Sequence, residues 1–262
     1  MIRSTFKLCF LFIFLSSISL VKAEGEDLDV EFDYDPESNH GPDHWADLKP
    51  SWSTCRDGQL QSPIAINVTE DSVDLTLSKL NVMYLPSEAV LRNNGHGIEL
   101  NFLNFAGRLM LNGDAYFLQQ LHFHSPSEHI IQRVRFPLEM HLVHRSESGE
   151  EAVISVPFLK SYHSDFLDQF WDLLPQVSDK YAEVKVETVS VNLPVGPFYA
   201  RYNGSMTTPP CTENVSWTVC LWKWNTVSED QLKALKALDL GPNSRPLVDD
   251  NGRDVSLFLS RS

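Results

Sequence analysis

Apolar and polar residues alternate along most of this chain, in short runs that end at Asn-Gly, Pro or Ser clusters. A period of two is typical of β-strands that bury one face. The pattern predicts strands at residues 98–102, 109–111, 117–124, 139–144, 152–159, 184–191 and 216–222. Two helices are predicted, one from Ser164 to the residue before Pro175, and one from Ser228, where Gln231 completes a capping box. Few helices among many strands indicate a mainly β protein.

Length and composition fit one globular domain. The chain has 262 residues, of which 42% are hydrophobic and 21% charged, and this excludes a disordered or coiled-coil chain. No internal repeat or low-complexity linker marks a second domain, and all-β domains commonly reach this length. Lys and Arg total 21 against 35 Asp and Glu, a net charge of −14. A nucleic-acid-binding protein needs the opposite balance, so we expect no nucleic-acid partner.

The N-terminus is typical of a secretory signal peptide. Arg3 and Lys7 precede a mostly apolar stretch from Leu8 to Val21, and Ala23 offers a small residue for cleavage. The stretch is too short to cross a bilayer as a helix, although an uncleaved anchor is the alternative. We expect a signal peptide at 1–23, an acidic flexible tail at 24–33 and a folded domain at 34–262, with no membrane span after cleavage. The expected location is the secretory pathway, either extracellular or sorted onward to a vacuole or plastid.

Passage through the secretory pathway permits glycosylation and disulfides. Three Asn-X-Ser/Thr triplets are candidate glycosylation sites, of which we expect one or two to be used: Asn67, Asn203 and Asn214. Among the four cysteines, Cys9 leaves with the signal peptide. Cys55 and Cys211 lie in loop-like segments, whereas Cys220 lies in a strand-like run. The sequence therefore predicts a Cys55–Cys211 disulfide and a buried free thiol at Cys220.

The candidate chemistry lies on two predicted strands that carry histidines. Alternate residues of a strand share a face, so His122 and His124 point the same way, and His141 completes a set of three if its strand is a neighbour. Gln120 and Glu139 each precede a histidine of this set by two residues, where they can accept the hydrogen bond that orients a metal-bound imidazole. Three neutral imidazoles without a carboxylate or thiolate are typical of a catalytic zinc site. The alternative is that each is an ordinary polar strand residue. His144 faces away and is interpreted as structural; no role is assigned to His40, His44 and His163.

Several motifs together resemble the α-class carbonic anhydrases, which are themselves the standard example of three-histidine zinc. They are His-Phe-His and Glu-Met-His-Leu-Val-His around the histidine set, Asn-Asn-Gly-His at 93–96, Gln-Ser-Pro-Ile at 61–64 and Ser-Met-Thr-Thr-Pro-Pro at 205–210. The resemblance covers Tyr34 to about Arg253. Ser-Pro-Ser-Glu-His at 125–129 and Pro-Pro-Cys at 209–211 resemble the secreted plant-type branch. The resemblance implies a single domain around a large twisted, mostly antiparallel central sheet with a few short peripheral helices.

The resemblance also implies an activity, a cofactor and residue roles. The activity is the reversible hydration of CO₂ to bicarbonate and a proton by zinc-bound hydroxide, with Zn²⁺ held by His122, His124 and His141. Thr207 would accept a hydrogen bond from the hydroxide and donate its single hydroxyl proton to Glu128. His96 would shuttle protons. The remaining implied positions are a substrate pocket of Val143, Val153, Met206, Thr208 and Trp217, and a water network ordered by Tyr34 and Asn94.

Three positions depart from the family pattern. Ser125 stands where many animal members have Trp, Glu99 replaces an Asn near the shuttle path, and Val248 replaces a Gln. None belongs to the histidine set. The alternative function is a secreted carbonic anhydrase-like storage or binding protein with weak or no hydratase activity; such proteins commonly lose a zinc histidine or the Thr, and this chain has all four. We expect a monomer or weak dimer whose partner is a small-molecule substrate.

Overall fold

The computed structural model describes residues 31–192, 197–221 and 224–260. The chain divides into two compact units, Met1–Val30 and Glu31–Ser262, and only the second is described. The predicted signal peptide therefore lies outside the described residues, as does most of the predicted tail. The last residues of that tail contact the body of the second unit: the Phe32 ring stacks on the His96 ring at a centroid distance of 3.8 Å, and the Trp45 indole nitrogen donates to the main-chain oxygen of Asp33.

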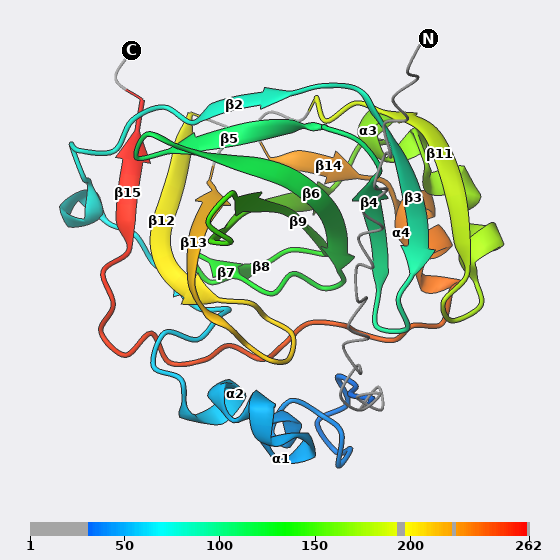
Figure 1. The fold of residues 1–262 in the computed structure, drawn as a ribbon, viewed down its shortest axis with the longest axis horizontal. Coiled ribbons are helices and arrows are strands. Elements are labelled where there is room, and N and C mark those ends of the chain that lie inside the picture. The colour runs from blue at the N-terminus through cyan, green and yellow to red at the C-terminus, as the bar shows by residue number, and fades with distance from the viewer. Residues whose placement is uncertain (1–30, 193–196, 222–223, 261–262) are drawn as a thin grey trace, which may run out of the picture. The chain divides into compact units, whose positions relative to one another are not determined.

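A large mixed sheet makes up most of the unit (Figure 1). Within the described residues it has twelve strands, nine of them in the order β11-β3-β4-β6-β9-β10-β13-β12-β15, while β14 pairs with β10 and β5 joins β2 to β6. Most pairs are antiparallel, and β10 pairs in parallel with β13 and β14. A small second sheet has the order β1-β7-β8. The mainly β prediction is confirmed.

The bounds of the strands follow the predicted runs closely. They are β1 (Ala65–Ile66), β2 (Asn81–Tyr84), β3 (Ser87–Asn93), β4 (Ile98–Phe102), β5 (Gly107–Leu111), β6 (Asp114–His124), β7 (Ile130–Ile131), β8 (Val134–Arg135), β9 (Leu138–Ser146), β10 (Glu151–Lys160), β11 (Glu183–Val189), β12 (Phe198–Ser205), β13 (Glu213–Cys220), β14 (Asn225–Val227) and β15 (Ser256–Leu259).

The helices are short. They are α1 (Trp45–Leu48), η1 (Pro50–Trp52), α2 (Thr54–Asp57), η2 (Glu70–Ser72), α3 (Asp165–Asp168), η3 (Trp171–Val177) and α4 (Glu229–Lys236), where η marks a 3₁₀-helix. The capping box of α4 is present, because the Ser228 hydroxyl accepts from the Gln231 main chain. The single helix predicted up to Pro175 is wrong. Phe170 has non-helical backbone angles between α3 and η3, and this break lets Phe170 and Trp171 both pack into the core.

Strand β9 lies in the centre of the sheet and is buried on both faces. Leu138, Met140 and Leu142 join a large apolar cluster on one face. Val143 joins a second cluster with Val153 and Trp217 on the other face. A strand between two apolar clusters is held rigidly, so polar side chains that project from its second face have fixed positions.

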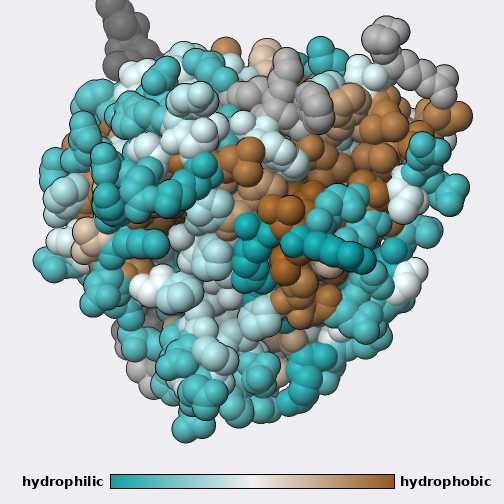
Figure 2. Space-filling view, turned by 180° about the vertical axis from the view of Figure 1, so that it is seen from behind, coloured by the Kyte–Doolittle hydropathy of each residue, from teal (hydrophilic) through white to brown (hydrophobic). Residues whose placement is uncertain are grey.

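On the face behind that of Figure 1, hydrophilic residues surround an apolar area (Figure 2). Apolar surface areas are typical of sites that contact another molecule. The oligomeric state, expected to be a monomer or weak dimer, stays a prediction. Over the described ranges, none of the helices combines the length and the apolar character needed to span a bilayer.

Candidate metal centre

The three predicted histidines come together on neighbouring strands. β6 and β9 are antiparallel, and their register places His122 opposite His141 and His124 opposite Glu139. Because side chains alternate, His122 and His124 share one face of β6 while Leu121 and Phe123 enter the apolar cluster on the other. One ring nitrogen from each of the three histidines lies within 4.8 Å of the other two.

Each imidazole is oriented by an acceptor on its far side. Nδ1 of His122 lies 2.9 Å from Gln120 Oε1, and Nδ1 of His124 lies 2.7 Å from the main-chain oxygen of Asn243. Nε2 of His141 lies 2.7 Å from Glu139 Oε1. These oxygens only accept, so the three nitrogens carry the protons and the opposite nitrogens present lone pairs.

The lone pairs converge on one point. Nδ1 of His141 and Nε2 of His122 are only 3.2 Å apart, and Nε2 of His124 is buried without a hydrogen-bond partner among the described residues. Burial lowers the pKa of all three imidazoles, for His122 well below its usual range, which keeps them neutral at pH 7. Neutral imidazoles with facing lone pairs fit a cation such as Zn²⁺.

Glu139 connects the histidine set to a buried network that the sequence analysis missed. Its Oε1 accepts from His129 Nδ1 at 2.6 Å and from the Ser155 hydroxyl at 2.7 Å, and His129 Nε2 lies 2.8 Å from the Tyr202 hydroxyl. Burial alone would raise the pKa of the Glu139 carboxyl, but His129 and His141 hold it well below its usual range. A second set of potential metal ligands comprises His129, Glu139 and His141. The ring nitrogens and the carboxylate oxygen that face one another in this set are already hydrogen-bonded to each other, so they are not free to bind a metal.

A row of apolar residues runs beside the histidines. The sheet register aligns Val143 on β9 with Val153 on β10, and Val153 with Trp217 on β13. The Trp217 indole nitrogen donates to the main-chain oxygen of Ser205 at 2.9 Å, which leaves ring carbons to face the cavity. The cavity has a volume of about 110 Å³ and is lined by Asn94, Glu99, Gln120, His122, His141, Val143, Val153, Met206, Thr207, Thr208 and Trp217.

Thr207 lines this cavity, whereas Glu128 is not among the lining residues. Both are buried, and Glu128 Oε1 accepts from the main-chain nitrogen of Arg245 at 2.8 Å. Burial raises the pKa of Glu128 to about 7, against the lowering effects of His141, the Arg245 main chain and a hydrogen bond from the Thr207 hydroxyl. The second oxygen, Oε2, has no hydrogen bond of regular geometry with a described residue, so the contact with Thr207 is loose.

The residues expected in proton transfer are only partly in the cavity. Asn94 lines it, and its side chain donates to Glu99 Oε2 at 3.0 Å. Glu99 also accepts from Asn101, so its carboxylate is held by two amides beside His122. His96 is not among the lining residues; its main-chain nitrogen donates to Asn94 Oδ1, and its ring stacks on Phe32. Tyr34 packs edge-on against Trp45 outside the lining set.

The predicted disulfide is confirmed. Cys55 and Cys211 are bonded across a sequence separation of 156 residues, and Cys220 is a buried free thiol. Cys211 ends the segment that carries Met206, Thr207 and Thr208. The three glycosylation candidates Asn67, Asn203 and Asn214 are exposed, and their use stays a prediction.

Comparison with known proteins agrees with this geometry. Residues 40–262 match the profile of the eukaryotic-type carbonic anhydrases. The sequence is 38% identical to α-carbonic anhydrase 7 of Arabidopsis thaliana, over 95% of this chain and 92% of that protein, and 41% identical to dioscorin DB3S of Dioscorea polystachya, over 87% of each. A structure of the α-carbonic anhydrase of Thermovibrio ammonificans with the inhibitor sulfanilamide superposes with a TM-score of 0.80 at 32% identity, covering 87% of this chain and 99% of that one. The chain belongs to the α-carbonic anhydrase family.

Proposed function

We propose that this protein binds one Zn²⁺ through His122, His124 and His141 and catalyses the reversible hydration of CO₂ to bicarbonate and a proton. The proposal rests on the convergence of three oriented lone pairs beside an apolar row; one of them is buried and has no hydrogen-bond partner in the described part of the chain. Zinc held by three neutral imidazoles lowers the pKa of a bound water to about 7 and so supplies a nucleophile at neutral pH; carbonic anhydrase is itself the standard example.

Thr207 and Glu128 orient the attacking oxygen. A hydroxyl has one proton, and in this proposal Thr207 donates it to the Glu128 carboxyl, whose pKa the Thr207 hydroxyl helps to lower. The Thr207 oxygen is then left to accept a hydrogen bond from a donor in the cavity, which turns that donor's lone pair toward the substrate. This role needs an ionised Glu128. Positive charge at the histidine set favours the ionised form, because it lowers the pKa of a nearby carboxyl.

Val143, Val153 and Trp217 hold the substrate. CO₂ has no net charge and accepts hydrogen bonds weakly, so an apolar wall beside the nucleophile binds it without having to replace strong hydration. Bicarbonate is charged and gains nothing from such a wall. The same surface therefore favours release of the product into water.

His96 carries the proton away, through waters that Asn94 and Tyr34 order. Asn94 lines the cavity, and its side-chain oxygen accepts from the main-chain nitrogen of His96, so it connects the cavity wall to the segment that carries His96. Histidine suits this role because its ordinary pKa of about 6.5 lets it accept and release protons near neutrality. The Glu99 carboxylate is a further polar group in the lining of the cavity.

The test is stopped-flow CO₂ hydration on the purified protein, with zinc content measured in the same preparation. We expect about one zinc per chain and a hydration rate that falls to background when a chelator removes the metal and returns when zinc is restored. A preparation with a full complement of zinc and no hydration above background would contradict the enzymatic function.

The relatives give a specific reason to keep a second candidate. Proteins named dioscorin are as similar to this chain as those named carbonic anhydrase. The second candidate is a secreted carbonic anhydrase-like storage or binding protein with weak or no hydratase activity. The intact histidine set and Thr207 favour the enzyme. We further propose that the protein enters the secretory pathway, which the apolar segment at 8–21 and the disulfide support.

A further inference from the structure

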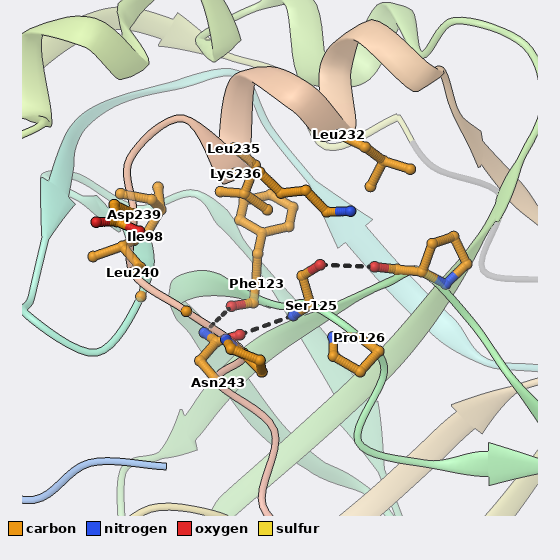
Figure 3. A pocket seen from close by; sticks show the side chains of 14 residues that line it. Ile98, Phe123, Ser125, Pro126, Leu232, Leu235, Lys236, Asp239, Leu240 and Asn243 are labelled. Atoms are coloured by element: carbon orange, nitrogen blue, oxygen red, sulfur yellow. Dashed lines mark hydrogen bonds between the residues drawn. The ribbon is translucent and has the colours of Figure 1, made fainter. Parts of the chain in front are cut away.

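A second cavity lies on the other face of β6 from the metal centre. His122 and His124 project from one face of this strand, whereas Phe123, and Ser125 just beyond the strand end, project from the other. The cavity has a volume of about 440 Å³, within the range of pockets that take small molecules. Figure 3 shows it between the strand end, helix α4 and the segment at 239–243, and its lining residues are Gly97, Ile98, Phe123, Ser125, Pro126, Pro137, Leu232, Leu235, Lys236, Asp239, Leu240, Gly241, Pro242 and Asn243.

The polar groups of the pocket floor are already paired. Asn243 Nδ2 donates to the main-chain oxygen of Phe123 at 2.9 Å, and Asn243 Oδ1 accepts from the main-chain nitrogen of Ser125 at 2.8 Å. The Ser125 hydroxyl donates to the main-chain oxygen of Pro137 at 3.0 Å (Figure 3). The floor therefore offers an occupant carbon surface and few free hydrogen-bonding groups. A polar group buried there would lose its water without gaining a partner, so the buried part of a ligand must be apolar.

Charge is confined to the rim. Lys236 and Asp239 are both exposed. Figure 3 shows the Lys236 side chain extended along the pocket, with its ammonium on the side of Ser125, while Asp239 lies at the opposite side beside Leu240 and Ile98. Among the described residues, no carboxylate oxygen lies within 4.0 Å of the Lys236 ammonium. On the same helix, by contrast, the Lys233 ammonium lies 3.2 Å from Asp230 Oδ1. The Lys236 ammonium can therefore pair with an anionic group of a ligand.

Ser125 helps to keep the space open. It occupies a position at which many animal members of the family have Trp, and an indole there would occupy volume that the small Ser side chain leaves free. Ser125, which departs from the family pattern, thus lines this second cavity rather than the metal centre.

We propose that this pocket is a binding site for a small aromatic carboxylate. The ring lies between the α4 leucines, Leu232 and Leu235, and the Phe123–Pro126 floor, and the carboxylate pairs with Lys236 at the rim. The site is separate from the CO₂ cavity, yet its floor includes Asn243, whose main-chain oxygen accepts from His124.

The probe for the test is 2-naphthoate, titrated into the purified protein and followed by the NMR signals of side-chain methyl groups. We expect saturable shifts at Ile98, Leu232, Leu235 and Leu240, with a dissociation constant of about 1 mM, as about 0.3 kcal/mol per non-hydrogen atom gives for a ligand of this size. Shifts confined to Val143 and Val153 would place the probe in the CO₂ cavity and overturn the proposal. The absence of any saturable shift up to about ten times the expected constant would overturn it as well.

Two variants separate the ring contact from the charge contact. Leu235→Trp fills the pocket and should weaken 2-naphthoate binding at least tenfold, whereas Leu103→Trp, at an exposed position outside the lining set, should leave it unchanged. Lys236→Gln should weaken binding about two- to fivefold, which corresponds to an exposed ion pair, and should not affect the uncharged 2-naphthamide. Equal affinity of the Lys236→Gln variant and the wild type for 2-naphthoate would refute the carboxylate assignment, even if Leu235→Trp failed to fold.

Discussion

Thr207 is buried, and its hydroxyl is proposed to donate to the Glu128 carboxyl. Thr207→Ala removes the group that orients the nucleophile and leaves the three histidines in place. We expect the rate of CO₂ hydration to fall by on the order of 10²-fold, the effect of losing one preorganised catalytic hydrogen bond, with zinc content unchanged. Thr207→Ser keeps the hydroxyl and should restore most of the rate. A Thr207→Ala variant with normal zinc and a normal rate would remove this role.

His96 is predicted to carry the proton that each hydration cycle releases. A site with a pKa of about 7 loses protons directly to water at only about 10²–10³ s⁻¹, because their diffusional return is limited to about 10⁹–10¹⁰ M⁻¹s⁻¹. Faster turnover needs a proton acceptor on the protein. His96→Ala should therefore lower kcat at least several-fold in dilute buffer, with little change in kcat/KM, and added imidazole should restore much of it.

The control for His96 is His44→Ala, at an exposed position with no assigned role. It should behave like the wild type in the same buffer. If His96→Ala turns over like the wild type and imidazole has no effect, the shuttle role is wrong. The charged Glu99 carboxylate, held by Asn94 beside the cavity, would then be the next group to substitute.

At the residue scale, the sequence predicts side chains but not main-chain partners. His122, its acceptor Gln120 and His124 follow from the period of two along a single strand. The acceptor for His124 is the main-chain oxygen of Asn243, and no residue type signals such a partner. His129 was missed for another reason: it lies in an irregular segment after β6, where no periodicity predicts that its ring turns inward to Glu139.

At the element scale, the Cys55–Cys211 disulfide ties helix α2 to the end of the segment that carries Thr207. A cross-link across 156 residues restricts the unfolded chain, and the chain-entropy estimate is about 5 kcal/mol, with less commonly measured. The Cys55→Ser/Cys211→Ser double variant should therefore unfold at a clearly lower urea concentration than the wild type. Added reductant should shift the wild type toward the double variant and leave the double variant itself unchanged.

This prediction has two ways to fail. Equal unfolding midpoints for the wild type with and without reductant would show that the cross-link does not stabilise the fold. Mass mapping that placed Cys220 in a bridge would contradict the pairing itself, since the thiol of Cys220 is free and buried.

The bounds of strands and helices were predictable where the local sequence pattern agrees with the way the residues pack in the fold. Strand β4 has the predicted bounds, and α4 begins at its capping box. In the segment after Ser164, the buried residues Phe166, Leu167, Phe170 and Trp171 have the spacing of a single helical face, so the local pattern gives no sign of the break at Phe170. A break at Phe170 brings them into the core, and this choice depends on the neighbouring strands rather than on local sequence.

At the scale of the whole molecule, buried histidines make stability depend on pH. His144 is buried between the Tyr84 hydroxyl and the main-chain oxygen of Ala152, and burial lowers its pKa from 6.5 to about 4. As the pH falls, the unfolded chain takes up this proton first. The stabilising contribution is therefore fully present above pH 6.5 and is lost as the pH falls toward 4. The difference between the two pKa values corresponds to about 3 kcal/mol.

We expect the free energy of unfolding to decrease between pH 7 and pH 4.5, and the decrease to be smaller in His144→Gln, in which the other buried histidines still contribute. The exposed His163→Gln is the control and should keep the wild-type pH dependence. The comparison of variants is necessary because Glu128 acts in the opposite direction. Burial raises its pKa to about 7, so its contribution is present below pH 4.5 and is lost as the pH rises through 7. Parallel pH profiles for the wild type and His144→Gln would refute the assignment.

The global arrangement was predictable only in part. Alternation shows which residues of one strand share a face, but it does not show which strands are neighbours. That β6 lies beside β9, with His122 opposite His141, follows from the order of strands across the sheet, which depends on long-range packing. The resemblance to the family supplied this information before the structure did.

The most direct test of the account is to measure zinc content and CO₂ hydration together in the wild type and in His141→Ala. The account predicts about one zinc per chain and rapid hydration for the wild type, and loss of both for His141→Ala, because two protein ligands hold zinc poorly. His144→Gln, on the opposite face of the same strand, should retain both. Stoichiometric zinc and near-normal turnover in His141→Ala would contradict the three-histidine metal centre.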